Sequence, residues 1–284
     1  MTTLPKLGGT PFLTDAGLET CLIFHDGFEL PQFAAFTLLD NPAGTEGLRA
    51  YYRAFLDLAG EHGTGFVLDA PSWRASPDWG AAIGYDRTQL AAANVRGIDL
   101  IAELRREGGD ANPVVLNLPI GPRGDGYDPG DMMSAAEARA YHAWQIGVAA
   151  DAGLPAVVSF TVETDGRLPT GMTLAEAVRQ TDDAVGGIAY FMINCAHPSH
   201  FAAVLDDPAL AARIGGIRAN ASRMSHAELD QAAELDEGNP AELAADYRGL
   251  LAALPGLCVL GGCCGTDHRH VDAIAHACLP AMRA

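Results

Sequence analysis

Three cysteines stand where they could bind one metal ion together. Cys195 follows the apolar run YFMIN, and Cys263 and Cys264 follow the run LCVL through Gly261 and Gly262. If both runs are strands of a parallel barrel, the three thiols lie at the same rim although they are far apart in the chain. Three thiolates and one open position form the ligand arrangement of a catalytic zinc site. A zinc ion bound by Cys195, Cys263 and Cys264 is therefore one interpretation of these residues.

A simpler interpretation of these cysteines stays open. Free cysteines commonly serve as small hydrophobic core residues, and no CxxC pattern supports a metal site. The remaining cysteines, Cys21, Cys258 and Cys278, are predicted to pack in the core. Four histidines near the cysteines are further candidate ligands, although helix caps or rim positions are their commoner roles: His197, His200, His268 and His270.

Composition bounds the class of protein. The chain has 284 residues, of which 49% are hydrophobic and 19% charged, as expected for a globular protein with a sizeable core. Its formal net charge of -18 opposes binding to nucleic acid or to anionic membranes, because that affinity comes mostly from Lys and Arg. The N-terminal segment MTTLPKLGGTPFLTD lacks the pattern of a signal peptide, and no apolar run has the length of a membrane span. We expect a cytoplasmic enzyme whose cysteines remain thiols.

Short apolar runs alternate with alanine-rich segments of helical character. Strands are predicted at Phe12–Asp15, Gly65–Asp69, Val114–Asn117, Ala156–Thr161, Tyr190–Asn194, Gly216–Arg218 and Leu257–Leu260. Helices are predicted at Gly47–Glu61, Arg87–Glu107, Ser134–Ala152, Thr173–Val185, Ser199–Arg213 and Pro240–Leu254. Capping boxes are predicted for the pairs Ser134 with Glu137 and Thr173 with Glu176.

The regular alternation of strands and helices predicts one parallel α/β domain over residues 1–284, either a doubly wound sheet or a TIM (β/α)8-type barrel. The barrel is favoured, since LTDAGLET after the first strand is not the GxGxxG loop of a nucleotide-binding sheet. Polar residues also gather after the strands, as at the catalytic rim of a barrel. Seven strands are found where a closed barrel uses eight, so the barrel is predicted to be incomplete.

Four motifs resemble one known family, the zinc-dependent homocysteine S-methyltransferases, which include betaine- and S-methylmethionine-using enzymes. They are DAGLET at Asp15–Thr20, INCAHP at Ile193–Pro198, RANAS at Arg218–Ser222 and GGCCGTDHRHV at Gly261–Val271. The resemblance spans nearly the whole chain and implies that Cys195, Cys263 and Cys264 bind zinc. It also implies transfer of a methyl group from a sulfonium or quaternary ammonium donor to the thiol of homocysteine or a similar small thiol.

The chain departs from the family pattern in two places. The loop after the second strand reads LDAPSWRAS at Leu68–Ser76, where the family has a sequence like TNSYQAS. The fourth βα unit of the family is missing between Asp151 and Pro155, in agreement with the shortage of strands. The alternative to an active enzyme is therefore a non-catalytic zinc- or metabolite-binding relative that has lost turnover.

Candidate substrate contacts follow the predicted strands: Asp15, Glu19, Asn194 and Asn220. Glu19 is a candidate for the ammonium of the acceptor, although an acid in the first turn of a helix is also favoured by the helix dipole alone. The two asparagines are candidates for orienting substrate or backbone groups, or they complete turns.

The methyl donor is a cation, which aromatic rings and an acidic protein attract. Trp73, Trp79 and Tyr127 are candidate contacts for it, with loop packing as the alternative. The long loop Gly121–Asp131 is a candidate cover for the site.

Overall fold

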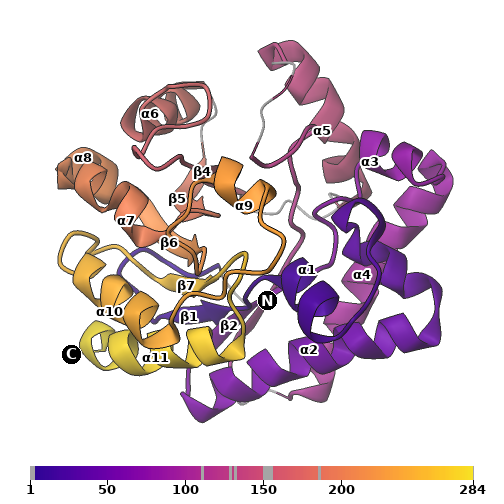
Figure 1. The fold of residues 1–284 in the computed structure, drawn as a ribbon, viewed down its shortest axis with the longest axis horizontal. Coiled ribbons are helices and arrows are strands. Elements are labelled where there is room, and N and C mark those ends of the chain that lie inside the picture. The colour runs from indigo at the N-terminus through magenta and orange to yellow at the C-terminus, as the bar shows by residue number, and fades with distance from the viewer. Residues whose placement is uncertain are drawn as a thin grey trace.

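The computed structural model describes residues 4–109, 112–127, 130, 133–149, 156–184 and 187–283. Its centre is one sheet of seven strands, all parallel, in the order β3-β2-β1-β7-β6-β5-β4 (Figure 1). The strands are β1 Phe12–Thr14, β2 Gly65–Asp69, β3 Val114–Asn117, β4 Ala156–Thr161, β5 Ile188–Asn194, β6 Ile214–Ala219 and β7 Val259–Gly262. The first and last strands, β1 and β7, are neighbours, so the sheet curls as in a TIM-type barrel.

The barrel is open between β3 and β4. These two strands are the edges of the sheet, and no eighth strand joins them among the described residues. A complete barrel would place its fourth strand at this position. The prediction of an incomplete barrel with seven strands is confirmed, while the segment Asp151–Pro155, where the missing unit was placed, lies outside the described residues.

Helices surround the sheet (Figure 1). The α-helices are α1 Leu18–Thr20, α2 Pro42–Glu61, α3 Pro77–Ala82, α4 Arg87–Glu107, α5 Ala135–Ala149, α6 Leu174–Ala184, α7 Pro198–Phe201, α8 Pro208–Ala211, α9 His226–Asp230, α10 Pro240–Leu250 and α11 His268–Met282. A π-helical turn, η1 Cys21–His25, continues α1, and 3-10 turns occur at η2 Pro31–Phe33, η3 Ala35–Asp40 and η4 Ala202–Asp206.

Most predicted elements are found, with one helix wrong, while the short helices α1, α3 and α9 and the long helix α11 were not predicted. The helix predicted at Ser199–Arg213 is divided into α7, η4 and α8, because Asp207 adopts an extended conformation and caps a new helix that starts at Pro208. Proline has no N–H to continue a preceding helix, which explains the break. The C-terminal helix α11 was not predicted; Asp267 caps it and forms a capping box with His270.

Both predicted capping boxes form. Ser134 Oγ accepts from the Glu137 N–H at 3.3 Å, and the Glu137 carboxylate accepts from the Ser134 N–H at 2.8 Å. Thr173 and Glu176 make the same reciprocal pair at 3.2 and 3.1 Å. These bonds satisfy N–H groups that a helix start leaves without partners, and so fix where α5 and α6 begin.

Side chains alternate between two faces of each strand. Leu13, Ile193 and Leu260 pack outward into the main core under the helices. Tyr190 and Val259 belong to a smaller cluster inside the barrel, which residues such as Val67, Val157 and Met192 extend and which Leu4 joins. Toward the carboxyl ends of the strands the inner face becomes polar, and this is the end that carries the candidate site.

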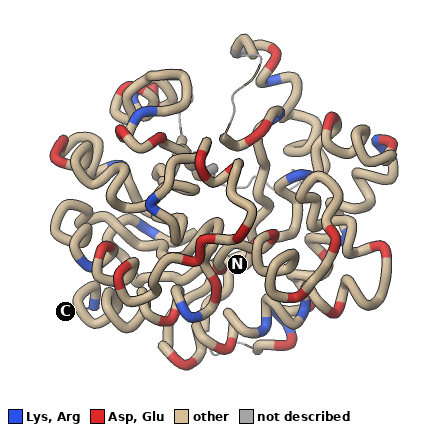
Figure 2. The backbone as a smooth tube through the Cα atoms, in the orientation of Figure 1, with Lys and Arg blue, Asp and Glu red and all other residues tan. Residues whose placement is uncertain are grey.

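Charge is spread over the whole chain, and acidic residues outnumber basic ones (Figure 2). In the part of the chain that the structure describes, no helix combines the length and the apolar character needed to cross a bilayer.

Candidate metal centre

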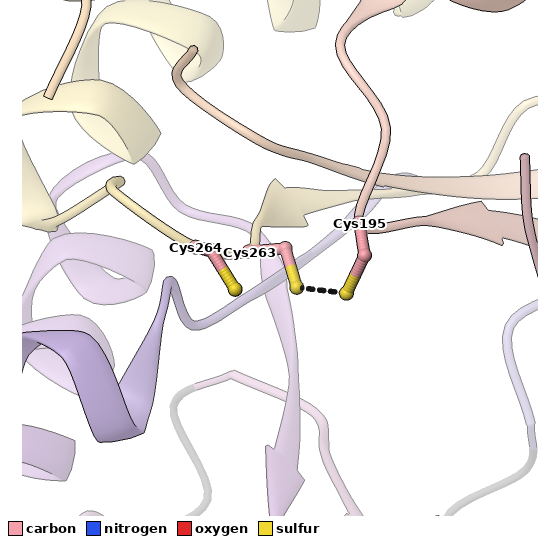
Figure 3. A group of neighbouring side chains, drawn as sticks. All are labelled: Cys195, Cys263 and Cys264. Atoms are coloured by element: carbon pink, nitrogen blue, oxygen red, sulfur yellow. Dashed lines mark hydrogen bonds between the residues drawn. The ribbon is translucent and has the colours of Figure 1, made fainter. Parts of the chain in front are cut away.

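The three predicted cysteines meet at the carboxyl ends of two strands. Cys195 directly follows β5, while Cys263 and Cys264 directly follow β7, and only β6 separates these strands in the sheet. The Sγ atoms of Cys195 and Cys263 are 2.6 Å apart, and all three Sγ atoms lie within 4.8 Å of one another (Figure 3). All six cysteines are free thiols, and Cys21, Cys258 and Cys278 are buried away from this group, as predicted.

Local backbone geometry produces this convergence. Cys195 has a φ of 53°, a left-handed conformation that costs a residue other than glycine about 1–2 kcal/mol. This turn at the end of β5 aims its side chain toward Cys263. On the other side, Gly265 has a φ of +77°, so the chain reverses directly after the cysteine pair.

Glycines around the pair are needed for close approach. Gly261 and Gly262 are the last two residues of β7. A Cβ at Gly261 would lie 2.3 Å from the Thr14 side chain, and one at Gly17 would lie 2.6 Å from the carbonyl oxygen of Cys263. The glycines therefore let the loops after β1 and β7 pack directly against each other beside the thiols.

The three thiols differ in pKa. Hydrogen bonds from Cys195 and Cys263, together with one from the Tyr127 hydroxyl at 3.1 Å, hold the pKa of the Cys264 thiol well below its ordinary value. The hydrogen bond to Cys195, a further one to Cys264, and burial raise the pKa of Cys263. For Cys195 the hydrogen bond with Cys263 lowers the pKa, but its interaction with Cys264 and burial raise it more. A negative charge in this group is therefore concentrated on Cys264.

The donor set fits a zinc ion. Three half-buried sulfur atoms from separate loops are the soft ligands that zinc takes, and three is the number of protein ligands that catalytic zinc sites use. Within the described part of the chain, ligand-type atoms also lie close together in two other groups, and neither contains a thiol: His62 with Asp272 and His276, and His25 with Glu237 and Asp267.

Below the thiols, the inner face of the barrel carries a buried charge cluster. The Arg218 guanidinium, on β6, donates to both Asp15 and Asp69, and its Nε donates to the Gly262 carbonyl at 3.2 Å. Tyr51 donates to the second oxygen of Asp15 at 3.2 Å. Burial raises the pKa of Asp15 to about 6 although Arg218 opposes the shift.

The predicted substrate residues lie around the thiols in different settings. Asp15 is 1% exposed and both of its oxygens accept internal hydrogen bonds, so its substrate role stays a prediction. Glu19, in α1, receives no hydrogen bond from any side chain of the described residues, and burial, then proximity to Cys264, raises its pKa to about 7. Asn194 donates to Thr161 at 3.1 Å, while Asn220 donates to the carbonyl oxygen of Cys195 at 3.0 Å.

The aromatic candidates divide into two groups. Tyr127 lies at the thiols through its bond to Cys264. Trp73 and Trp79 instead enclose Arg74, whose guanidinium carbon is 4.0 and 3.6 Å from the two ring centroids. The ring faces of Trp73 and Trp79 that contact Arg74 are therefore not available to the cationic methyl donor.

Arg74 also holds the loop that carries Tyr127. It donates to the Gly124 carbonyl at 3.2 Å and to Asp125 at 3.1 Å, and Asp125 accepts from the Tyr127 N–H at 2.8 Å. The described part of the predicted cover, residues 121–127 and 130, thus reaches the thiols at Tyr127.

Three residues with roles at the site were not predicted from the sequence: Arg74, Arg218 and His226. One signal was present, because a charged Arg218 interrupts the otherwise apolar run of β6. The four candidate histidine ligands have other partners or positions. His197 and His270 take part in helix caps, His200 bonds the Arg223 carbonyl, and His268 begins α11.

Comparisons with known proteins agree with this geometry. A family model described as homocysteine S-methyltransferase matches residues 148–278, a segment that includes all three cysteines. No curated protein matches the chain.

Solved structures share the fold. The homocysteine methyltransferase MmuM from Escherichia coli in its metallated form is 19% identical, with a TM-score of 0.68 over 94% of this chain and 96% of that one. Its oxidized form is 20% identical, with a TM-score of 0.70 over 94% and 95% of the two chains. Over residues 148–278, and in the place of its cysteines on a barrel of this fold, the chain is similar to the homocysteine S-methyltransferases.

Proposed function

We propose that this protein is a zinc-dependent S-methyltransferase. It moves a methyl group from a sulfonium or quaternary ammonium donor to the thiol of homocysteine or a similar small thiol. The observation that carries the proposal is the convergence of Cys195, Cys263 and Cys264 at the rim of the barrel. A metallated form is known for the similarly folded MmuM, which supports a metal here.

Cys195, Cys263 and Cys264 would hold the ion. When bound there, zinc would lower the pKa of an acceptor thiol, so that at neutral pH the acceptor would be a thiolate and still a nucleophile. The Tyr127 hydroxyl, which donates to Cys264, helps to stabilise negative charge on that sulfur.

The reaction balances without a further reactant. The acceptor thiol loses its proton, and a lone pair on its sulfur forms a bond to the methyl carbon. The bond from that carbon to the cationic sulfur or nitrogen of the donor breaks, and its electron pair stays on the leaving group. The products are a methyl thioether and an uncharged sulfide or tertiary amine.

Glu19 is the proposed contact for the ammonium group of the acceptor. Its carboxyl group is close enough to Cys264 for the two charges to interact, and no side chain of the described residues pairs with it. Asp15 then acts indirectly, by holding Arg218, and Asn194 lines the inner face beside the acceptor.

Tyr127 is the proposed aromatic contact for the donor. Of the three aromatic candidates it is the one that touches the thiols, whereas Trp73 and Trp79 enclose Arg74. A cationic methyl group next to its ring would gain a cation–π interaction.

One observation favours the alternative of a non-catalytic zinc- or metabolite-binding relative. The sheet is open between β3 and β4, so a unit that contributes to the wall of a complete barrel is absent from the described residues. Turnover and zinc content separate the two functions, because the alternative keeps the metal and loses the reaction.

The test is a methyl-transfer assay with homocysteine and, in separate reactions, S-methylmethionine and betaine. The proposal predicts methionine with at least one donor and about one zinc per chain, both lost in Cys264→Ala. The matched control is Cys278→Ala, which removes a buried cysteine of α11 and is expected to retain both. Zinc without product across donors would support the non-catalytic alternative, and a folded protein without zinc would refute both.

A further inference from the structure

The conformation of Cys195 requires an explanation beyond its own residue type. Among the described residues other than glycine, only Gln32, Phe33 and Cys195 have a positive φ. The first two lie in η2 at the surface, whereas Cys195 ends a buried strand and carries a candidate metal ligand. A disfavoured backbone conformation persists only where the surroundings hold it.

Two side chains hold the carbonyl group of Cys195. Asn220 Nδ2 donates to this oxygen at 3.0 Å, and His226 Nε2 lies 2.6 Å from it. Both side chains are at least nine-tenths buried, with 2% and 3% exposed. Because a carbonyl oxygen can only accept, Nε2 of His226 carries the proton.

The imidazole of His226 is itself fixed from two directions. Glu163 Oε1 lies 3.0 Å from Nδ1, on the edge opposite Cys195. The Tyr127 ring stacks on the imidazole, with 4.1 Å between centroids and 9° between planes. The contact with Glu163 fixes the direction of Nδ1 in the ring plane, and the stacked Tyr127 ring fixes the orientation of that plane. Together they direct Nε2 toward the carbonyl oxygen of Cys195.

We propose that His226, supported by Asn220, is a positioning residue that holds Cys195 in its left-handed conformation and thereby keeps Sγ in place as a ligand. Without these two bonds the residue would relax toward negative φ, which swings its side chain away from Cys263. Outer groups that orient ligands in this way commonly govern metal affinity. The inference rests on the proposed zinc site but not on turnover.

The test compares His226→Phe with His226→Gln. Phenylalanine keeps a ring for Tyr127 to stack on but has no N–H, whereas glutamine can place an amide N–H close to the position of Nε2. Zinc affinity is measured by competition with a chromogenic chelator, and the melting temperature of each metal-free protein is measured alongside. We expect zinc binding about 10- to 100-fold weaker in His226→Phe and largely restored in His226→Gln.

A matched control is His200→Phe. His200 Nε2 also contacts a backbone carbonyl, that of Arg223 at 2.9 Å, but Arg223 is not a ligand. Its substitution is expected to leave zinc affinity unchanged. Cobalt substitution adds a second readout, since the sulfur-to-cobalt charge-transfer absorption of His226→Phe should fall relative to the control.

Three outcomes would overturn the inference. One is wild-type zinc affinity in His226→Phe. Another is an equal loss of zinc affinity in His226→Phe and His226→Gln, accompanied by an equal fall in the melting temperatures of the metal-free proteins. That result would indicate that His226 only stabilises the fold. The third is a wild-type protein that binds no zinc, which refutes the proposed function as well. If zinc binding is weakened in His226→Phe and restored in His226→Gln but no methyl transfer is found, the inference is supported and only the proposed function is refuted.

Discussion

Arg218 places one guanidinium inside the barrel between two carboxylates, Asp15 and Asp69. The side chains of these acids are 2% and 6% exposed, so their charge is tolerated only because Arg218 and neutral donors such as Tyr51 neutralise or solvate it. The cluster lies directly beneath the loops that carry the thiols. Its integrity therefore affects both folding and the site.

The first prediction concerns this cluster. Arg218→Met removes the cation and leaves two buried carboxylates without it, which is expected to cost about 3–5 kcal/mol of unfolding free energy at pH 7.5. The pKa of Asp15 is already about 6 with Arg218 present, and removal raises it further. The acid is then protonated at pH 5, so the loss should be smaller there, as urea denaturation at the two pH values can measure.

Arg53→Met is the control, because Arg53 pairs with Glu46 and Glu107 where all three side chains are exposed. It should change the unfolding free energy by less than about 1 kcal/mol. An Arg218→Met protein with the same small loss at both pH values would show that the buried charges are not interdependent.

Glu19 gives a prediction about pH and substrate. Burial raises its pKa to about 7, so below this pH it is neutral and cannot pair with an ammonium group. The KM of the wild-type enzyme for homocysteine should therefore rise as the pH falls through 7. Glu19→Gln should raise KM about 10- to 100-fold at pH 8, with little change in kcat, and remove this acid-side dependence.

The raised pKa of Glu19 also makes the stability of the fold depend on pH. Since the folded-state pKa of Glu19 exceeds the ordinary value of 4.5, the folded protein binds the proton more tightly than the unfolded chain. Its contribution to stability is present below pH 4.5 and is lost as the pH rises toward 7. An unchanged KM in Glu19→Gln would contradict its role as the ammonium contact.

For individual residues, residue type and strand position were enough to predict the three thiols, but not the side chains that hold them in place. Cys195, Cys263 and Cys264 could be predicted to meet because parallel strands bring their carboxyl ends to one rim. Arg74 and His226 could not be found in this way, since their roles depend on contacts between loops and on a backbone conformation at Cys195.

Among the elements, the loop between β3 and α5 depends on a contact with the loop after β2. Arg74, 5% exposed between two tryptophans, anchors Gly124 and Asp125, and through them Tyr127. The second-strand loop, which departs from the family pattern in sequence, thus supports the aromatic residue at the thiols.

The prediction for this pair of loops uses Arg74→Met. Loss of the two hydrogen bonds and the ion pair should loosen the loop, so trypsin should cleave at the exposed Arg123 several-fold faster, and KM for the donor should rise. Zinc content should not change. Arg53→Met, which alters an exposed pair on α2, serves as control, and equal cleavage rates in the two variants would contradict the anchoring role.

The boundaries of elements were predictable where local signals decide them. The helix Arg87–Glu107 was predicted with its observed limits, and Asp86 and Gly108 flank it as caps. The division of Ser199–Arg213 was missed because an alanine-rich composition outweighed the proline in the prediction, whereas Pro208 decides the break in the structure.

For the whole molecule, we propose that residues 1–284 form a single domain. One core cluster joins Leu13 of β1 and Leu22 of η1 to Leu279 of α11, so both ends of the described chain pack into the same interior. The break in the barrel lies across the sheet from β7, and the strands that carry the thiols, β5 and β7, are held on both sides. The open edges therefore leave the strands next to the candidate metal centre paired on both sides.

Hydrogen exchange tests this arrangement. Edge strands have a partner on one side only, so the amides of β3 and β4 should exchange fastest among the strands, and those of β6 and β7 slowest. Mass spectrometry of peptic fragments can measure the difference. Equal protection of β3 and β4 with β7 would indicate that the two edges are paired and the barrel is closed.

The most direct test of the zinc centre is X-ray absorption at the zinc edge of the purified protein, before and after addition of homocysteine. We predict about three sulfur neighbours at about 2.3 Å and a lighter fourth ligand, which is replaced by a fourth sulfur when the thiol binds. A protein without zinc, or a zinc shell of nitrogen and oxygen that homocysteine does not change, would contradict the claim that Cys195, Cys263 and Cys264 hold the ion for an incoming thiol.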